Sequence, residues 1–233
     1  MRFRPVITLA VLLGVHAARA DTFPLPRPGR SFSVRVETTA GDNPPVVMTI
    51  HRKVVGANGE TATIHNTFDE LPPGTAGIVP SPDNLTTMRS FLLVATSIRT
   101  RAANAPTDAP PELRTYQLDC DDALLRSFFP IGHIPSVTMT CNAITTAPGR
   151  SPQANKVEMT IAWEGAATVD TPIGHAEVQD IRVTLTQPRS KIETTYRFDE
   201  ARGLTLASEQ TVSSGDPPRL VNRLRSEIVS IDP

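Results

Sequence analysis

Hydrophobic and polar residues alternate along much of the chain. Phe32, Val34 and Val36 fall on one face of an extended segment, and the polar residues between them fall on the other. A period of two predicts a half-buried β-strand that starts near Ser31. A second strand is predicted over Val46–Val55, after a turn sequence at 41–44, GDNP.

The carboxy-terminal half repeats this alternation with short gaps between segments. In the clearest case Ile192, Thr194, Tyr196 and Phe198 share one face. Further strands of this half are predicted over Val137–Ile144, Val157–Trp163, Ala176–Thr186, Leu204–Val212 and Leu220–Ile231, and one strand of the first half is predicted over Thr61–Asn66. Because connections this short join antiparallel neighbours, this half is predicted to be a β-meander.

One stretch, 82–102, has a helical pattern instead. Ser81-Pro82 suits an N-cap followed by the first residue of a helix. Apolar residues then follow at helical spacing: Leu85, Met88, Leu92 and Ala95. We predict a helix here, with a strand over Phe91–Ile98 as the alternative. A second, shorter helix is predicted to begin near Asp121.

These elements predict a mainly β protein of the α+β kind. The favoured architecture is a curved antiparallel sheet, or half-barrel, of about ten strands, with one or two helices against its concave face. A closed barrel or a β-sandwich is the alternative. A half-open barrel needs a cover for its apolar face, and the 82–102 helix or a bound ligand would supply it.

The first twenty residues have the features of a secretory signal peptide. Arg2 and Arg4 precede a short apolar run, and the segment ends in the small-x-small sequence at 18–20, ARA. The run is about half of the ~20 residues that a membrane-spanning helix needs, which disfavours a membrane anchor. We therefore predict a signal peptide over 1–20 and a single β-rich domain over 21–233, located in the periplasm or secreted.

The charge balance limits the kinds of partner, and the cysteine content indicates a disulfide. The chain has 23 Lys and Arg against 24 Asp and Glu, and removal of the arginine-containing first segment makes the remainder more acidic. This argues against nucleic acid as a partner. No later segment is long and apolar enough for a stable membrane span. Cys120 and Cys141 are predicted to form a structural disulfide, the default state in an oxidising compartment.

The sequence carries no recognisable catalytic, phosphate-binding or cofactor motif, so no catalytic residue and no cofactor is assigned. His51 and His65 lie on adjacent predicted strands, but a zinc site needs three or four ligands, so no metal site is predicted. The acidic segment Asp119–Asp122 is interpreted as the cap of the short helix rather than a calcium site. An enzyme site built from His133, His175 and this segment is the alternative hypothesis.

Several segments resemble uncharacterised secreted β-rich proteins of Gram-negative bacteria, which form a domain family of unknown function. The resemblance rests on 168–178 (TVDTPIGHAEV), on 195–198 (TYRF) with Gly203-Leu204, and on the lead-in 23–32 (FPLPRPGRSF). The sequence departs from that pattern at His175, and at 196–198, where tryptophan is common. Such proteins are similar to the half-barrel of periplasmic lipoprotein carriers, which implies an open sheet that can admit acyl chains.

The resulting expectation is a non-catalytic periplasmic binding or envelope-associated protein that accepts an apolar or lipid ligand, or a segment of a partner envelope protein. The candidate ligand-binding residues are aromatic or apolar side chains on the predicted concave face: Trp163, Tyr196, Phe198 and Leu92. A hydrolase or other enzyme with a site assembled from distant residues is the alternative.

Overall fold

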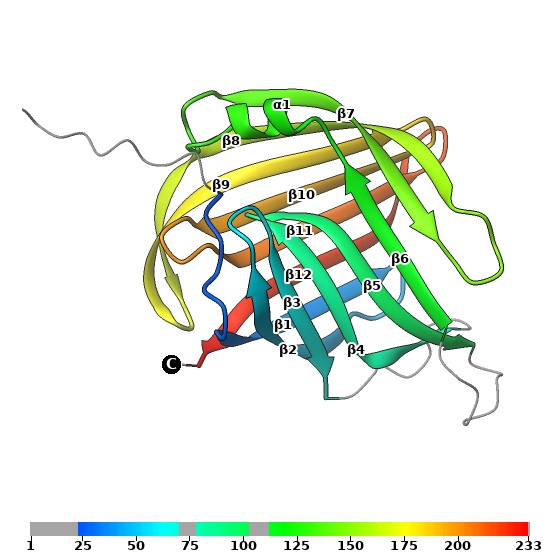
Figure 1. Cartoon of the computed structure of the whole chain (residues 1–233), viewed down its shortest axis with the longest axis horizontal. Coiled ribbons are helices and arrows are strands. Elements are labelled where there is room, and N and C mark those ends of the chain that lie inside the picture. Colours follow the sequence, from blue (N-terminus) through cyan, green and yellow to red (C-terminus); the bar gives the residue numbers. More distant parts are fainter. Residues whose placement is uncertain (1–22, 70–77, 103–111, 233) are drawn as a thin grey trace, which may run out of the picture.

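The computed structural model describes residues 23–69, 78–102 and 112–232, and this part of the chain folds into twelve strands and one short helix (Figure 1). The elements are β1 (Ser31–Ala40), β2 (Val46–Ala57), β3 (Ala62–Phe68), β4 (Ile78–Arg89), β5 (Leu92–Ala102), β6 (Glu112–Asp119), α1 (Asp122–Ser127), β7 (Ser136–Thr146), β8 (Gln153–Thr171), β9 (Gly174–Gln187), β10 (Ser190–Asp199), β11 (Leu204–Ser214) and β12 (Arg219–Ile231). In the described ranges no helix has the length and apolar character needed to span a membrane.

The strands form a closed antiparallel barrel. Each strand pairs with the next along the chain, and β1 also pairs with β12, in a register that runs from Phe32 opposite Ile231 to Ala40 opposite Asn222. The predicted open half-barrel of about ten strands is therefore wrong, and its closed-barrel alternative is correct. Turn residues decide the pairing of consecutive strands, whereas the meeting of the first and last strands depends on the tilt and stagger of the whole sheet. Closure leaves neither terminal strand with an unpaired edge.

The predicted helix over 82–102 is also wrong. This stretch forms most of the β4–β5 hairpin, which turns at Ser90, a non-glycine residue with φ 56°. Apolar residues three and four apart suit a helix, but here Leu85 is exposed while Phe91 and Leu92 are buried at the turn. Pairing with β3 and β6 on either side overrides the local preference.

The shorter helix is confirmed as α1. The Asp121 side chain caps it by accepting a hydrogen bond from the Leu124 backbone N–H at 3.0 Å, as the cap interpretation of the acidic segment predicts. Leu125 and Phe128 are buried below the helix. The adjacent Cys120–Cys141 disulfide joins the end of β6 to β7, which confirms the predicted pairing of the two cysteines.

The short helix and the amino-terminal arm, residues 23–30, cover one end of the barrel, which we call the closed end. Phe23 in the arm is buried and makes an edge contact with Phe129 just after α1, with ring centroids 4.9 Å apart. Arg89 and Arg126 each lie 5.3 Å from the Phe23 ring, and Arg89 pairs with Asp122 of α1. Helix, arm and the β4–β5 turn are thus held together by aromatic, cation–π and ionic contacts.

Candidate functional site

The register of the barrel identifies the residues that face the lumen, because residues paired across strands lie on the same side of a sheet. Val36, Ser226, Ser208, Tyr196 and Ile181 lie side by side across β1, β12, β11, β10 and β9. Val36 and Ile181 are fully or almost fully buried, so this row lies on the inner face. Their neighbours along each strand face outward.

Side chains on the inner face are less buried the farther they lie from the closed end. On β8 the inward residues Met159 and Ile161 have no exposed surface, whereas Asn155 and Gln153, farther along the same face, are exposed. Thr145, which pairs with Gln153, is exposed as well. We call this other end, which carries the β1–β2, β7–β8, β9–β10 and β11–β12 turns, the open end.

The same gradient holds on the strands across the barrel. Ile228 of β12 is buried, but the inward residues Leu224 and Asn222, nearer the open end, are partly exposed. Gln210 and Val212 of β11, which pair with them, are partly exposed too. Side chains that face inward and still keep accessible surface are not packed on all sides. The lumen is therefore filled by side chains near the closed end and accessible toward the open end.

A polar patch interrupts the apolar inner wall on β2, β3 and β4. Arg52, Asn66 and Asn84 lie side by side in the register of these strands. The amide nitrogen of Asn66 donates to Asn84 Oδ1 at 2.7 Å and to Thr86 Oγ1 at 2.9 Å. Asn66 is buried, so these hydrogen bonds fix its orientation and satisfy its donors.

Arg52 is the charged member of this patch, and it has no acidic partner among the described residues. Its Nε is buried without a hydrogen-bond partner. The guanidinium is enclosed by protein, and this burial lowers its pKa from 12.5 to about 10. The side chain nevertheless keeps part of its surface accessible, and that surface faces the lumen because Arg52 lies on the inner face. A buried, unpaired cation of this kind is costly for the fold.

A second arginine lies on the same wall. The arm continues the β1–β2 pairing beyond Ser31, with Val54 N–H donating to Arg30 O at 2.9 Å, which places Arg30 opposite the inward Val54. Nη1 of Arg30 is buried without a hydrogen-bond partner. Sequence analysis missed both arginines. The available signal was Arg52 itself, a charge in the alternating apolar series Met48, Ile50 and Val54.

The four predicted ligand-binding residues belong to one apolar cluster toward the closed end. Leu92 and Phe198 are almost completely buried in it, and Tyr196 and Trp163 pack against it. Phe91 packs between them, 5.6 Å from the rings of both Tyr196 and Phe198. Burial raises the pKa of Tyr196 to about 12, against the opposing effect of its hydrogen bond with Thr194. The structure thus places these residues in the wall that ends the accessible lumen, and their contact with a ligand stays a prediction.

The residues of the alternative enzyme hypothesis take separate structural roles. His175 pairs with Asp170, and both side chains are 83% exposed. His133 is exposed in the loop before β7. Asp121 and Asp122 serve the helix cap and the ion pair with Arg89. In the part of the chain that the structure describes, no group of three or more His, Cys, Asp or Glu side chains is placed to hold a metal ion.

The structure does bring together a serine, a histidine and an aspartate that sequence analysis did not connect. Ser33 Oγ lies 2.9 Å from His51 Nδ1, and His51 Nε2 lies 2.8 Å from Asp69 Oδ2. These side chains are on the outer face, and those of His51 and Asp69 are 45% and 70% exposed. A serine nucleophile needs oxyanion donors and a site that limits water, and a solvated outer wall provides neither.

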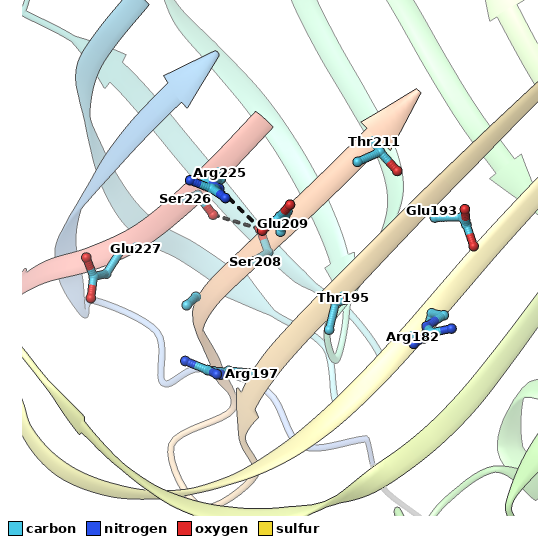
Figure 2. Close-up of a pocket in the computed structure, with 11 residues that line it drawn as sticks. Arg182, Glu193, Thr195, Arg197, Ser208, Glu209, Thr211, Arg225, Ser226 and Glu227 are labelled. Carbon is cyan, nitrogen blue, oxygen red and sulfur yellow. Dashed lines mark hydrogen bonds and ion pairs between the residues drawn. The ribbon is translucent and has the colours of Figure 1, made fainter. Parts of the chain in front are cut away.

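The outer face also has a charged depression of about 540 Å³ over β9 to β12 (Figure 2). Its charged lining is balanced between three arginines and three glutamates: Arg182, Arg197, Arg225, Glu193, Glu209 and Glu227. Burial would raise the pKa of Glu209, but the charges and hydrogen bonds of Arg223 and Arg225 outweigh it and lower this pKa. Figure 2 shows Arg225 directed at Glu209, so the depression largely neutralises its own charge.

The chain is similar to solved structures at low sequence identity. No family model and no curated protein matches the chain. The hypothetical lipoprotein YmcC from Escherichia coli K12 is 12% identical, with a TM-score of 0.47 over 87% of this chain and 85% of that one. A protein from Bacteroides fragilis, assigned as exported and having a YmcC-like fold, is 11% identical, with a TM-score of 0.39 over 91% and 99% of the two chains.

The resemblance to secreted β-rich proteins of unknown function, noted from the sequence, thus stays a prediction.

Proposed function

We propose that this protein is an exported, non-catalytic binding protein whose barrel lumen accepts an apolar or amphiphilic ligand through the open end. The single observation that carries the proposal is the gradient of accessibility on the inner face. Inward side chains such as Met159 and Ile161 are fully buried toward the closed end, whereas Leu224 and Val212 keep accessible surface toward the open end. Pockets for small molecules are concave and largely apolar, with a few polar groups that orient the ligand.

Two features support an extracytoplasmic location. The first twenty residues, which lie outside the described part of the chain, have the composition of a signal peptide. The Cys120–Cys141 disulfide is of the kind that persists in oxidising compartments. A carrier or sensor of amphiphiles in the envelope is consistent with both.

Two variants of adjacent residues test the lumen directly. Val212 faces inward, paired with Ile192 and Asn222, and Thr211 faces outward, paired with Glu193 and Arg223. Val212→Trp should place a large ring in the accessible part of the lumen. Thr211→Trp adds the same ring to the outer wall and serves as the matched control.

The measurement is binding of the neutral fluorescent probe N-phenyl-1-naphthylamine, together with native mass spectrometry and lipid extraction of the wild-type protein after mild purification. We expect the probe to bind the wild type and Thr211→Trp alike, and Val212→Trp to bind about tenfold or more weakly. A wild-type protein that binds neither probe nor extractable lipid would contradict the proposal. Equal binding by the two tryptophan variants would place the probe outside the lumen and contradict it as well.

A further inference from the structure

The unpaired Arg52 on the lumen wall has no structural explanation in the fold itself. Most salt bridges between the described residues join exposed or partly exposed side chains, for example Arg182 with Glu164 and Lys191 with Glu193, and the buried Asp199 is paired with Arg202. Arg52 instead points into the barrel, and no inward-facing residue of β1, β2 or β3 is acidic. A buried guanidinium is retained at a cost to stability unless an anion binds to it.

The surroundings of Arg52 indicate what kind of anion fits. Along β2 the flanking inward residues are Ile50 and Val54, and across the β1 pairing lies Phe32. These residues belong to, or pack against, the second apolar cluster of the barrel. A free inorganic ion would leave that apolar wall uncovered, whereas an oxyanion attached to an alkyl chain would contact both the cation and the wall.

The accessible surface indicates in which direction the alkyl chain of such a ligand would extend. Ile50 and Met48, the inward residues between Arg52 and the open end, are both partly exposed. At ~3.3 Å per strand residue, the path along β2 from Arg52 to Val46 is about 20 Å. This span is comparable with an extended long-chain alkyl group. On the other side Val54 has no exposed surface, so a chain has no accessible path toward the closed end.

The adjacent polar residues add to the selectivity. Asn66, opposite Arg52, is held by Asn84 and Thr86, so the wall beside the guanidinium is rigid and polar. Arg30 supplies a second inward guanidinium, opposite Val54. A planar guanidinium binds carboxylate and phosphate oxygens in a bidentate manner.

We infer that the lumen binds single-chain anionic amphiphiles head first, with a carboxylate or phosphate oxyanion on the guanidinium of Arg52 and the alkyl chain along Ile50 and Met48 toward the open end. This inference rests on the proposed binding function and names the class of ligand. The chemistry shared by the two head groups is an oxyanion on one long alkyl chain.

The test compares three ligands of equal chain length: palmitate, hexadecyl phosphate and the neutral hexadecanol. Each is titrated against bound N-phenyl-1-naphthylamine on the full chain with its disulfide intact. The variants are Arg52→Gln and the matched control Lys53→Gln, which removes the same charge one residue away on the exposed outer face. Arg52→Met is a second variant, which keeps the apolar contacts of the side chain.

We expect the wild type to bind at least one of the two anions more tightly than hexadecanol. Arg52→Gln and Arg52→Met should weaken binding of that anion by about 10- to 100-fold, because a charge-assisted hydrogen bond is lost. Binding of hexadecanol should change by less than about threefold, and Lys53→Gln should change none of the three. The anion that loses more affinity identifies the head group as carboxylate or phosphate.

The outcomes separate the two proposals. If the Arg52 variants bind both anions as tightly as the wild type while the probe still binds, the role of Arg52 is refuted and the binding function remains. If the wild type binds neither the probe nor any of the three ligands, the binding function itself is refuted. If Arg52→Gln loses hexadecanol and the anions equally while Arg52→Met remains folded and behaves in the same way, a charge-specific role is excluded.

Discussion

Replacing Arg52 by methionine should make the protein more stable. Burial lowers the pKa of the Arg52 guanidinium from 12.5 to about 10. At neutral pH the group is charged in both the folded and the unfolded chain, so folding transfers a full charge into the barrel. Each pH unit corresponds to ~1.4 kcal/mol, so the charge costs about 3 kcal/mol.

The actual cost is smaller than this value, because the Arg52 side chain keeps some accessible surface in the lumen and water can solvate part of its charge. Methionine retains the contacts of the aliphatic stem with Ile50 and Val54 and carries no charge. We therefore expect Arg52→Met to raise the free energy of unfolding by about 1 to 3 kcal/mol, within the range seen when buried charges are replaced by apolar groups. The sign follows from linkage: the folded pKa is lowered, so the cost is constant below about pH 10 and is relieved only above it.

The assay is equilibrium unfolding in urea, followed by the fluorescence of Trp163. This residue is the single tryptophan of the chain, and its Nε1 donates to Gln179 Oε1 at 2.9 Å in the folded barrel. Lys53→Met is the control, since Lys53 is exposed on the outer face and its replacement should change the stability by less than ~0.5 kcal/mol. An Arg52→Met variant equal to or less stable than the wild type would refute the reasoning, because it would mean that the charge is solvated or paired in solution.

Three further changes test other parts of the structure. Gly203→Ala should destabilise the protein by more than Gly41→Ala, measured by urea titration. Both glycines have positive φ, which costs a non-glycine residue ~1 kcal/mol, but only at Gly203 would the added methyl meet the backbone of the amino-terminal arm. Replacing Cys120 and Cys141 by alanine should lower the free energy of unfolding by about 3 kcal/mol, measured in the same way, because the loop they close spans a separation of 21 residues. Burial raises the pKa of Tyr196 from 10.0 to about 12. The stability that the neutral phenol contributes to the folded state is therefore fully present below about pH 10 and is lost as pH rises toward 12. Tyr196→Phe should lose less stability than the wild type between about pH 9 and 11, measured by urea unfolding at each pH.

If the stability and binding predictions both hold, Arg52 is a residue kept for function at a cost to the fold. Such sites arise where a binding or catalytic group must be held in an environment that does not favour it. The pair of measurements is informative because a purely structural arginine would lower stability when replaced and would leave the relative affinities of anionic and neutral ligands unchanged.

Local sequence determined most of the strands. Alternation around Val34 and Val36, and again over Ile192–Phe198, identified half-buried strands, because the side-chain period of a strand is fixed by its backbone geometry. The helix cap at Asp121 was also predictable, because it depends on residues close in sequence. The disulfide was predictable because Cys120 and Cys141 are the two cysteines of the chain.

Tertiary structure alone decided the closure of the sheet, the β4–β5 hairpin and the position of Arg52. Closure depends on the summed tilt and twist of all twelve strands, which no segment encodes by itself. The hairpin at Ser90 exists because β3 and β6 pair with its two strands, against a local helical pattern. An arginine among alternating residues is ordinary in sequence; it becomes a buried, unpaired charge only when closure of the barrel makes its face the wall of a lumen.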